Sequence, residues 1–214
     1  PGLKTLDDAL DLRRKLLLAF ERAEAADDPD ERDAWLSFAI IGGGPTGVEL
    51  AGTLAEIARH TLEGEFRNID PARARVRLVE AGPRVLSSFP EDLSRKAQLQ
   101  LEKLGVEVQT GAAVEDINED GYFRDGRFVP ARTVVWAAGV AASPLGRCLD
   151  VPLDRAGRVK VRPDLTVPGH PEIFVAGDLA ALDRADGRPV PGVAPAAKQM
   201  GKHVARTIRA RLAG

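Results

Sequence analysis

The sequence has little of what several classes of protein need. Its 214 residues include a single cysteine, Cys148, so neither an internal disulfide nor a Cys-x-x-Cys pair is available, which excludes the dithiol reductases. Its only tyrosine, Tyr122, is followed four residues later by Gly126, so the Tyr-x-x-x-Lys pair of short-chain dehydrogenases is missing. The three histidines are scattered, and no metal site is predicted from them.

Charge of one sign and long apolar runs are also scarce. Lys and Arg total 30 and Asp and Glu total 32, so the net charge of −2 favours neither nucleic acid nor an anionic membrane. No apolar run reaches the roughly 18 residues typical of a membrane helix, and the first residues lack the parts of a signal peptide. The sequence therefore predicts a soluble, cytoplasmic chain with no nucleic-acid partner.

Residues 1–36 predict a helical lead-in. Thr5 can cap a helix, with Asp8 at the reciprocal position of a capping box, and apolar residues keep one face up to about Ala26. A short second helix that reaches Trp35 is expected after the acidic turn. These helices need a surface to pack against.

From residue 37 the pattern changes to alternating strands and helices, which predicts a parallel sheet. Helices are expected from Gly47 to about Leu62 and from Leu93 to Leu104, where Gly105 ends the second helix. The strands are expected at 38–41, 76–79, 106–108 and 133–137.

An antiparallel meander is predicted before the last of these strands. Its segments, 113–117, 122–123 and 127–129, are separated by two Asp-Gly pairs, which are strong hairpin signals. The whole unit, residues 37–142, is predicted to be a Rossmann-like domain that closes near Val140. Residues 143–214 hold two short strands, at 159–161 and 173–175, and a helix at about 194–212, which is too little for an independent domain.

The segment between the first strand and its helix is glycine-rich. Gly42, Gly44 and Gly47 fit G-x-G-x-x-G, with Gly43, Pro45 and Thr46 completing the turn. The first glycine allows the tight turn, the second lets the backbone approach a pyrophosphate, and the third lets helix and strand pack closely. The N–H groups at the helix start then face the anion. The turn predicts a dinucleotide site.

Glu80 stands at the end of the second strand, where an acid can bind the ribose 2′-hydroxyl of a dinucleotide. An acid repels a 2′-phosphate, so NAD(H) is favoured over NADP(H). Arg84 is close enough in sequence to weaken that preference, and a solvated strand end is the alternative interpretation of Glu80.

Further segments extend the pattern. They are Trp136 to Val140, which is a strand that ends in small residues, Ile173 to Asp178, which is a strand that ends in Gly-Asp, and Val193 to Gly201, which opens a helix. Together with the glycine turn and Glu80 to Leu86, their order and separation resemble the two-dinucleotide-binding-domain flavoproteins. Within these flavoproteins, the sequence most resembles the type II, non-proton-pumping NADH dehydrogenases, and this resemblance depends on residues 47–52 and 194–201.

The resemblance implies roles for particular residues. Gly177 and Asp178 would bind the flavin, and Ala138 and Gly139 would border the cofactor. Gln199 matches the second glutamine of the family's Ala-Gln motif, which begins here at Ala194, beside flavin and quinone. Departures at Pro195 and Lys198 leave a plain helix-surface interpretation of Gln199 open.

Glu49 is similar to the family's glutamate near the nicotinamide and flavin rings, so Glu49 and Gln199 are the candidate catalytic residues. A glutamate in the first helical turn is also explained by the helix dipole alone.

The fold implied is a three-layer, Rossmann-like FAD/NAD(P)-binding α/β fold with a partial flavin domain. The resemblance implies NADH, FAD and quinone as partners, with membrane contact through a carboxy-terminal region outside this chain and a homodimer left open. The family's first flavin-binding glycine motif has no counterpart here, so this chain is interpreted as an internal fragment that binds NADH weakly. A flavin-dependent ferredoxin or rubredoxin reductase, an apoptosis-inducing-factor-like oxidase and a non-catalytic dinucleotide-binding module are the alternatives.

Overall fold

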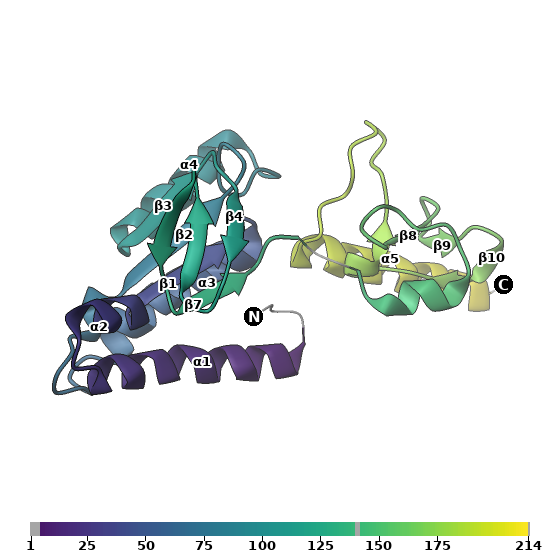
Figure 1. Cartoon of the computed structure of the whole chain (residues 1–214). Coiled ribbons are helices and arrows are strands. Elements are labelled where there is room, and N and C mark those ends of the chain that lie inside the picture. Colours follow the sequence, from purple (N-terminus) through teal and green to yellow (C-terminus); the bar gives the residue numbers. More distant parts are fainter. Residues whose placement is uncertain (1–4, 140–141, 214) are drawn as a thin grey trace. The chain divides into compact units, whose positions relative to one another are not determined.

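The computed structural model describes residues 5–139 and 142–213 of the chain. The chain divides into two compact units, one that ends at Ala138 and one that begins at Gly139 (Figure 1). The predicted end of the Rossmann-like domain near Val140 falls outside the described residues.

The first unit alternates helices and strands before its antiparallel part. Its main elements are α1 (Leu6–Ala25), α2 (Pro29–Trp35), β1 (Ser37–Ile41), α3 (Pro45–Glu56), β2 (Arg75–Glu80), α4 (Glu91–Lys103), β3 (Val106–Thr110), β4 (Val114–Ile117), β5 (Gly121–Arg124), β6 (Arg127–Pro130) and β7 (Thr133–Trp136). A π-helical turn (Ile57–Thr61) and a 3-10 turn (Pro71–Arg73) connect α3 to β2.

A four-stranded parallel sheet in the order β3-β2-β1-β7 forms the centre of this unit (Figure 1). All five residues of β1 are buried, because both faces of the sheet are covered. The chain passes from β1 outward to β2 and β3 and then returns to β7 on the other side of β1. The carboxyl end of β1 is therefore a topological switch point, the place where open α/β sheets bind ligands.

The helices α1, α3 and α4 contribute buried residues to the cluster on one face of the sheet. Phe38 and Ile40 of β1 share a buried cluster with Phe20 of α1 and Leu54 of α3, and the rings of Phe20 and Phe38 lie 5.3 Å apart. The predicted capping box begins α1, since the Asp8 N–H donates to the Thr5 hydroxyl and the Thr5 N–H donates to the Asp8 carboxylate. The helix α1, which was expected to need a surface to pack against, packs against the sheet of its own unit.

The antiparallel meander β4-β5-β6 covers the opposite face. The alternate residues of β1, Ala39 and Ile41, pack there with Val79 and with the fully buried Tyr122 of β5. Successive side chains of β1 therefore point to opposite faces of the sheet and belong to two separate clusters, one on the helix side and one on the meander side. The predicted three-layer arrangement is confirmed.

Several predicted boundaries need correction. Helix α3 begins at Pro45, not Gly47, because proline fits the first helical position, and its α-helical part ends at Glu56, before the π-helical turn. The turn before β5 spans 118–120, because the Asn118 side chain accepts the N–H groups of Asp120 and Gly121, so Gly121 already belongs to the strand. The other predicted hairpin turn, Asp125-Gly126, is confirmed.

The second unit is small and has short strands. They are β8 (Val159–Lys160), β9 (Thr166–Val167), β10 (His170–Phe174) and β11 (Ala180–Ala181), and they are accompanied by the helix α5 (Ala194–Leu212). Met200 of α5 packs with Val159, Val167 and Val175 in the buried cluster of this unit. Within the two described segments of the chain, none of the helices is both long and apolar enough to cross a membrane.

Candidate dinucleotide site

The glycine turn follows β1 at the switch point and leads directly into α3. Gly42 has φ +116°, and a Cβ built on it would lie 2.6 Å from the Ala138 nitrogen. A Cβ on Gly47 would lie only 1.8 Å from the Gly42 oxygen. Glycine is required at both positions, because the backbone of Gly42 packs against that of Ala138 and the backbone of Gly47 packs against that of Gly42. This agrees with the predicted tight turn at Gly42 and the predicted close approach of helix and strand at Gly47.

Gly44 is different, because it faces open space. Beyond Gly44 and its neighbours in the chain, no atom of the described residues lies within 4 Å of a Cβ built on Gly44, although its φ of −73° suits any residue. Gly44 is the N-cap of α3, and in the part of the chain described here no side chain caps that helix start. An uncapped twelve-residue helix whose first turn opens beside a small residue matches the shape and polarity that a pyrophosphate needs.

Glu80 connects the glycine turn with the loop that follows β2. Its carboxylate accepts the Gly43 N–H at 2.6 Å and the Gly82 N–H at 2.7 Å. Each oxygen has a further lone pair for a ribose hydroxyl, because a carboxylate can accept about four hydrogen bonds. Glu80 is therefore a fixed, half-buried side chain between two loops, which differs from the solvated strand end of the alternative interpretation.

Arg84 is held by the backbone of its own loop. Its guanidinium donates to the carbonyl oxygens of Leu86, Ser87 and Phe89 at 2.8–3.3 Å. The Leu86 N–H in turn donates to the Gly43 carbonyl at 2.7 Å. Sequence reasoning missed Gly82, Leu86 and this use of Arg84. A Gly-Pro pair such as Gly82-Pro83 is a general turn signal that could have located the loop, but no sequence signal gives the hydrogen bonds within it.

The other residues predicted for the nucleotide site do not all lie at the glycine turn. Pro45 and Thr46 form the first turn of α3, and Ala138 lies against Gly42. Glu49 is exposed and lines a hollow of about 260 Å³ between α3 and α4. Because α3 begins at Pro45, Glu49 lies beyond the first turn, so the helix dipole is a weaker explanation for it than predicted. Gly139 is exposed and belongs to the second unit.

In the second unit, Gly177 and Asp178 lie at a hollow of about 220 Å³ beside the start of α5. The Gly177 N–H donates to the Met200 sulfur at 3.2 Å, a contact that sequence reasoning missed. Asp178 is exposed, and Ala194 begins α5.

Arg158 also lines this hollow and is held by Asp154. The Asp154 carboxylate accepts the Arg158 side-chain N–H at 2.7 Å and the Arg158 backbone N–H at 2.8 Å. Burial raises the pKa of Asp154, but these hydrogen bonds and the one from Ala156 outweigh burial and hold the pKa below its usual value.

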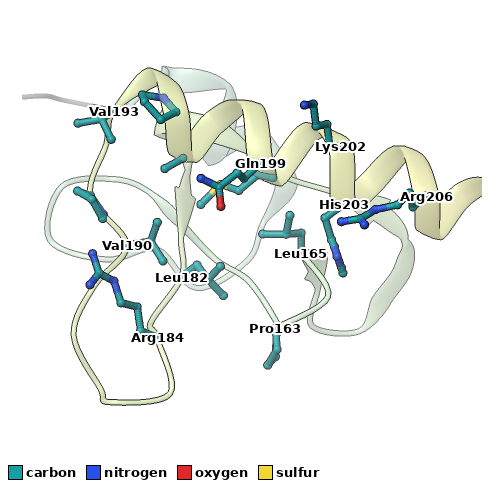
Figure 2. A pocket seen from close by; sticks show the side chains of 14 residues that line it. Pro163, Leu165, Leu182, Arg184, Val190, Val193, Gln199, Lys202, His203 and Arg206 are labelled. Atoms are coloured by element: carbon teal, nitrogen blue, oxygen red, sulfur yellow. The ribbon is translucent and has the colours of Figure 1, made fainter.

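Gln199 lines a larger hollow of about 630 Å³ in the same unit. In Figure 2, Gln199 and His203 point from α5 toward the loops that carry Leu182 and Pro163. The lining is mainly apolar and includes Leu165, with basic side chains of α5 at its edge. Such a hollow suits an apolar ring that needs a polar group at one end.

A switch-point glycine turn, an uncapped helix start and an acid at the end of the second strand together define a dinucleotide-binding Rossmann-type protein. Residues 1–201 match the model of the pyridine nucleotide-disulphide oxidoreductases, and the chain belongs to that family.

The sequence is 51% identical to the type II NADH:quinone oxidoreductase Ndh of Mycobacterium tuberculosis, over 100% of this chain and 47% of that protein. It is 34% identical to the type II NADH:quinone oxidoreductase of Haemophilus influenzae, over 96% of this chain and 49% of that protein. The chain thus spans about half the length of these curated relatives.

Among solved structures, NDH2 from Plasmodium falciparum in complex with NADH matches with a TM-score of 0.71 and 24% identity, over 84% of this chain and 39% of that chain. The covalent putidaredoxin reductase-putidaredoxin complex matches with a TM-score of 0.64 and 22% identity, over 95% of this chain and 44% of that chain. At these identities both structures support the fold alone.

Proposed function

We propose that this chain is the NAD(H)-binding portion of a flavin-dependent enzyme that oxidises NADH and reduces a quinone. The single observation that carries the proposal is the glycine turn at the switch point, with open space at Gly44 and a fixed carboxylate at Glu80. In such an enzyme NADH supplies a hydride, and FAD accepts it and passes the electrons on to the acceptor.

The residues of the first unit bind and orient the nucleotide. Backbone N–H groups at the start of α3, next to Gly44, bind the pyrophosphate, and Glu80 accepts the hydroxyls of the adenosine ribose. The negative charge of Glu80 disfavours a 2′-phosphate. Arg84 offsets that effect only in part, because three of its hydrogen bonds go to backbone carbonyls of its own loop. NADH is therefore preferred over NADPH.

In the second unit, Gly177 and Asp178 are proposed to hold the ribityl and phosphate region of FAD, with Ala194 and Gln199 of α5 near its ring system and the quinone. The apolar hollow beside Gln199 supports an apolar acceptor. The names of the curated relatives, type II NADH:quinone oxidoreductases, support the same acceptor. A nicotinamide-side role for Glu49 and a border role for Ala138 and Gly139 remain parts of this proposal.

The location of the whole protein follows from its acceptor. Quinones dissolve in membranes, so we place the longer protein at the inner face of the cell membrane, with its membrane contact made by segments outside this chain. The division into a lead-in (1–36), a nucleotide domain (37–142) and a returning flavin segment (143–214) belongs to the same proposal.

Calorimetry of the purified chain with NADH, NADPH and FAD tests the binding part. We expect weak binding of NADH, weaker binding of NADPH and no tight binding of FAD. A flavin absorption band in the purified chain would overturn the fragment interpretation, whereas an absence of NADH binding would overturn the proposed function itself. Binding of NADH by a full-length protein that contains no flavin would favour a non-catalytic module.

Activity of the full-length protein tests the acceptor. A quinone analogue is expected to be reduced faster than a ferredoxin, a rubredoxin or oxygen. The reverse order would favour the ferredoxin-reductase or oxidase alternatives.

A further inference from the structure

We propose that Arg84 is a positioning residue that holds the loop after β2 against the glycine turn and so sets the affinity for NADH. This inference rests on the proposed function, because it concerns the same nucleotide site. In this proposal Arg84 acts by fixing the backbone of its own loop, and it makes no direct contact with a phosphate of the nucleotide.

The loop contains a residue in an unfavourable conformation. Leu86 has φ +49°, in the left-handed region that residues with a Cβ rarely adopt. Such a conformation persists only where the surrounding contacts determine it. The Leu86 N–H donates to the Gly43 carbonyl at 2.7 Å, and this bond is available only while the loop keeps its shape.

Arg84 supplies the contacts that keep the loop in that shape. One guanidinium nitrogen, Nη1, donates to the carbonyls of Leu86 at 3.3 Å and Phe89 at 3.0 Å, and the other, Nη2, donates to the carbonyl of Ser87 at 2.8 Å. A planar guanidinium with several fixed donors can bridge three carbonyls, whereas a lysine ammonium is a point charge on a flexible stem.

The loop acts on the nucleotide site through Gly43. The carbonyl of Gly43 accepts from Leu86, and its N–H donates to Glu80 at 2.6 Å. Both backbone groups of Gly43 are therefore fixed, the N–H by the last residue of β2 and the carbonyl by the loop that follows β2. If the loop relaxes, the hydrogen bond to the Gly43 carbonyl is lost first, and the adjacent Gly44 loses its fixed position at the pyrophosphate.

Four variants separate the positioning role from its rivals. Arg84→Ala and Arg84→Lys are each expected to weaken NADH binding about tenfold, because neither side chain can bridge the three carbonyls. The double variant R84A/L86G is expected to recover most of the affinity, since glycine adopts φ +49° without strain. The matched control R84A/L86A removes the same side chain of Leu86 but keeps a Cβ, so it is expected to stay weak.

NADH and NADPH titrations of the 214-residue chain, followed by nicotinamide fluorescence, measure these effects. In R84A both nucleotides are expected to lose affinity by the same factor, so their ratio stays unchanged. Selective loss of NADPH affinity, or wild-type NADH affinity in R84K, would show that the charge of Arg84 acts on the phosphate and would overturn the inference. Arg13→Ala removes an exposed arginine of the same unit and is expected to leave both affinities unchanged.

Amide hydrogen exchange in the nucleotide-free chain measures the stability of the loop after β2 independently of nucleotide binding. The backbone amide at position 86 is expected to exchange slowly in the wild type, at least tenfold faster in R84A, and slowly again in R84A/L86G. Unchanged exchange in R84A refutes the positioning role whatever the nucleotide does. If exchange responds as expected but the wild-type chain binds no NADH, the proposed function fails while the loop contact stands.

Discussion

Gly44 and Gly47 lie three residues apart in the same turn, yet alanine at each is expected to have opposite effects. Alanine at Gly44 meets no atom within 4 Å among the described residues beyond its neighbours in the chain, and φ −73° suits it. G44A should therefore fold as well as the wild type and gain about 0.4–1 kcal/mol, because the unfolded chain loses freedom. Alanine at Gly47 would place its Cβ 1.8 Å from the Gly42 oxygen, so G47A should lose at least about 1–3 kcal/mol.

Nucleotide binding should separate from stability in G44A. A methyl group in the open space at Gly44 keeps the pyrophosphate from the backbone N–H groups, and each hydrogen bond to a charged group contributes about 1.5–3 kcal/mol. NADH affinity is then expected to fall by about 10- to 100-fold. Denaturant unfolding and fluorescence titration with NADH measure the two quantities. The matched variant G201A, at an open glycine of α5, should keep full affinity. Wild-type NADH affinity in G44A would refute the close approach.

Three further predictions concern other contacts. Glu80→Gln places an amide NH₂ group against one of two backbone N–H donors, so we expect a loss of about 1.5–3 kcal/mol in unfolding free energy and a smaller preference for NADH over NADPH in paired titrations. Thr5→Ala removes the hydroxyl that accepts from Asp8, and denaturant unfolding should show a loss of about 1 kcal/mol, which Thr5→Ser largely avoids. Asp154 has a lowered pKa in the folded chain, so its stabilising effect is complete above its ordinary value of 3.8 and lost as pH falls through the lower folded value. Unfolding of Asp154→Asn should accordingly depend less on pH below about pH 4, and an identical acid profile would contradict this assignment.

The sequence predicted the elements that have strong local signals. The capping box at Thr5, the buried strand β1 and the glycine turn each depend on residues that are neighbours in the chain, and all are present where expected. The strands β9 and β11 were missed, because two residues are too few to form a periodic pattern; β8 is equally short, but it lies in the alternating segment Val159-Lys160-Val161.

The details that the sequence could not give are those that depend on tertiary contacts. The position of Glu80 at the strand end was predictable, but its hydrogen bonds to Gly43 and Gly82 depend on how two loops meet. Arg84 was considered as a charge that could favour NADP(H), whereas the turn of its own loop brings three carbonyls to its guanidinium. The sequence shows which chemical groups Glu80 and Arg84 carry, but the geometry of the loops determines which hydrogen-bond partners these groups have.

The double attachment of Gly43 has a consequence for protein engineering. Its N–H is bound by Glu80 and its carbonyl by Leu86, so the glycine turn and the loop after β2 share one backbone unit as an anchor. A designer who grafts only one of these segments from an NADPH-dependent scaffold would leave Gly43 with mismatched partners. Redesign of coenzyme preference in this fold should therefore exchange residues 42–47 and 80–89 together as one cassette.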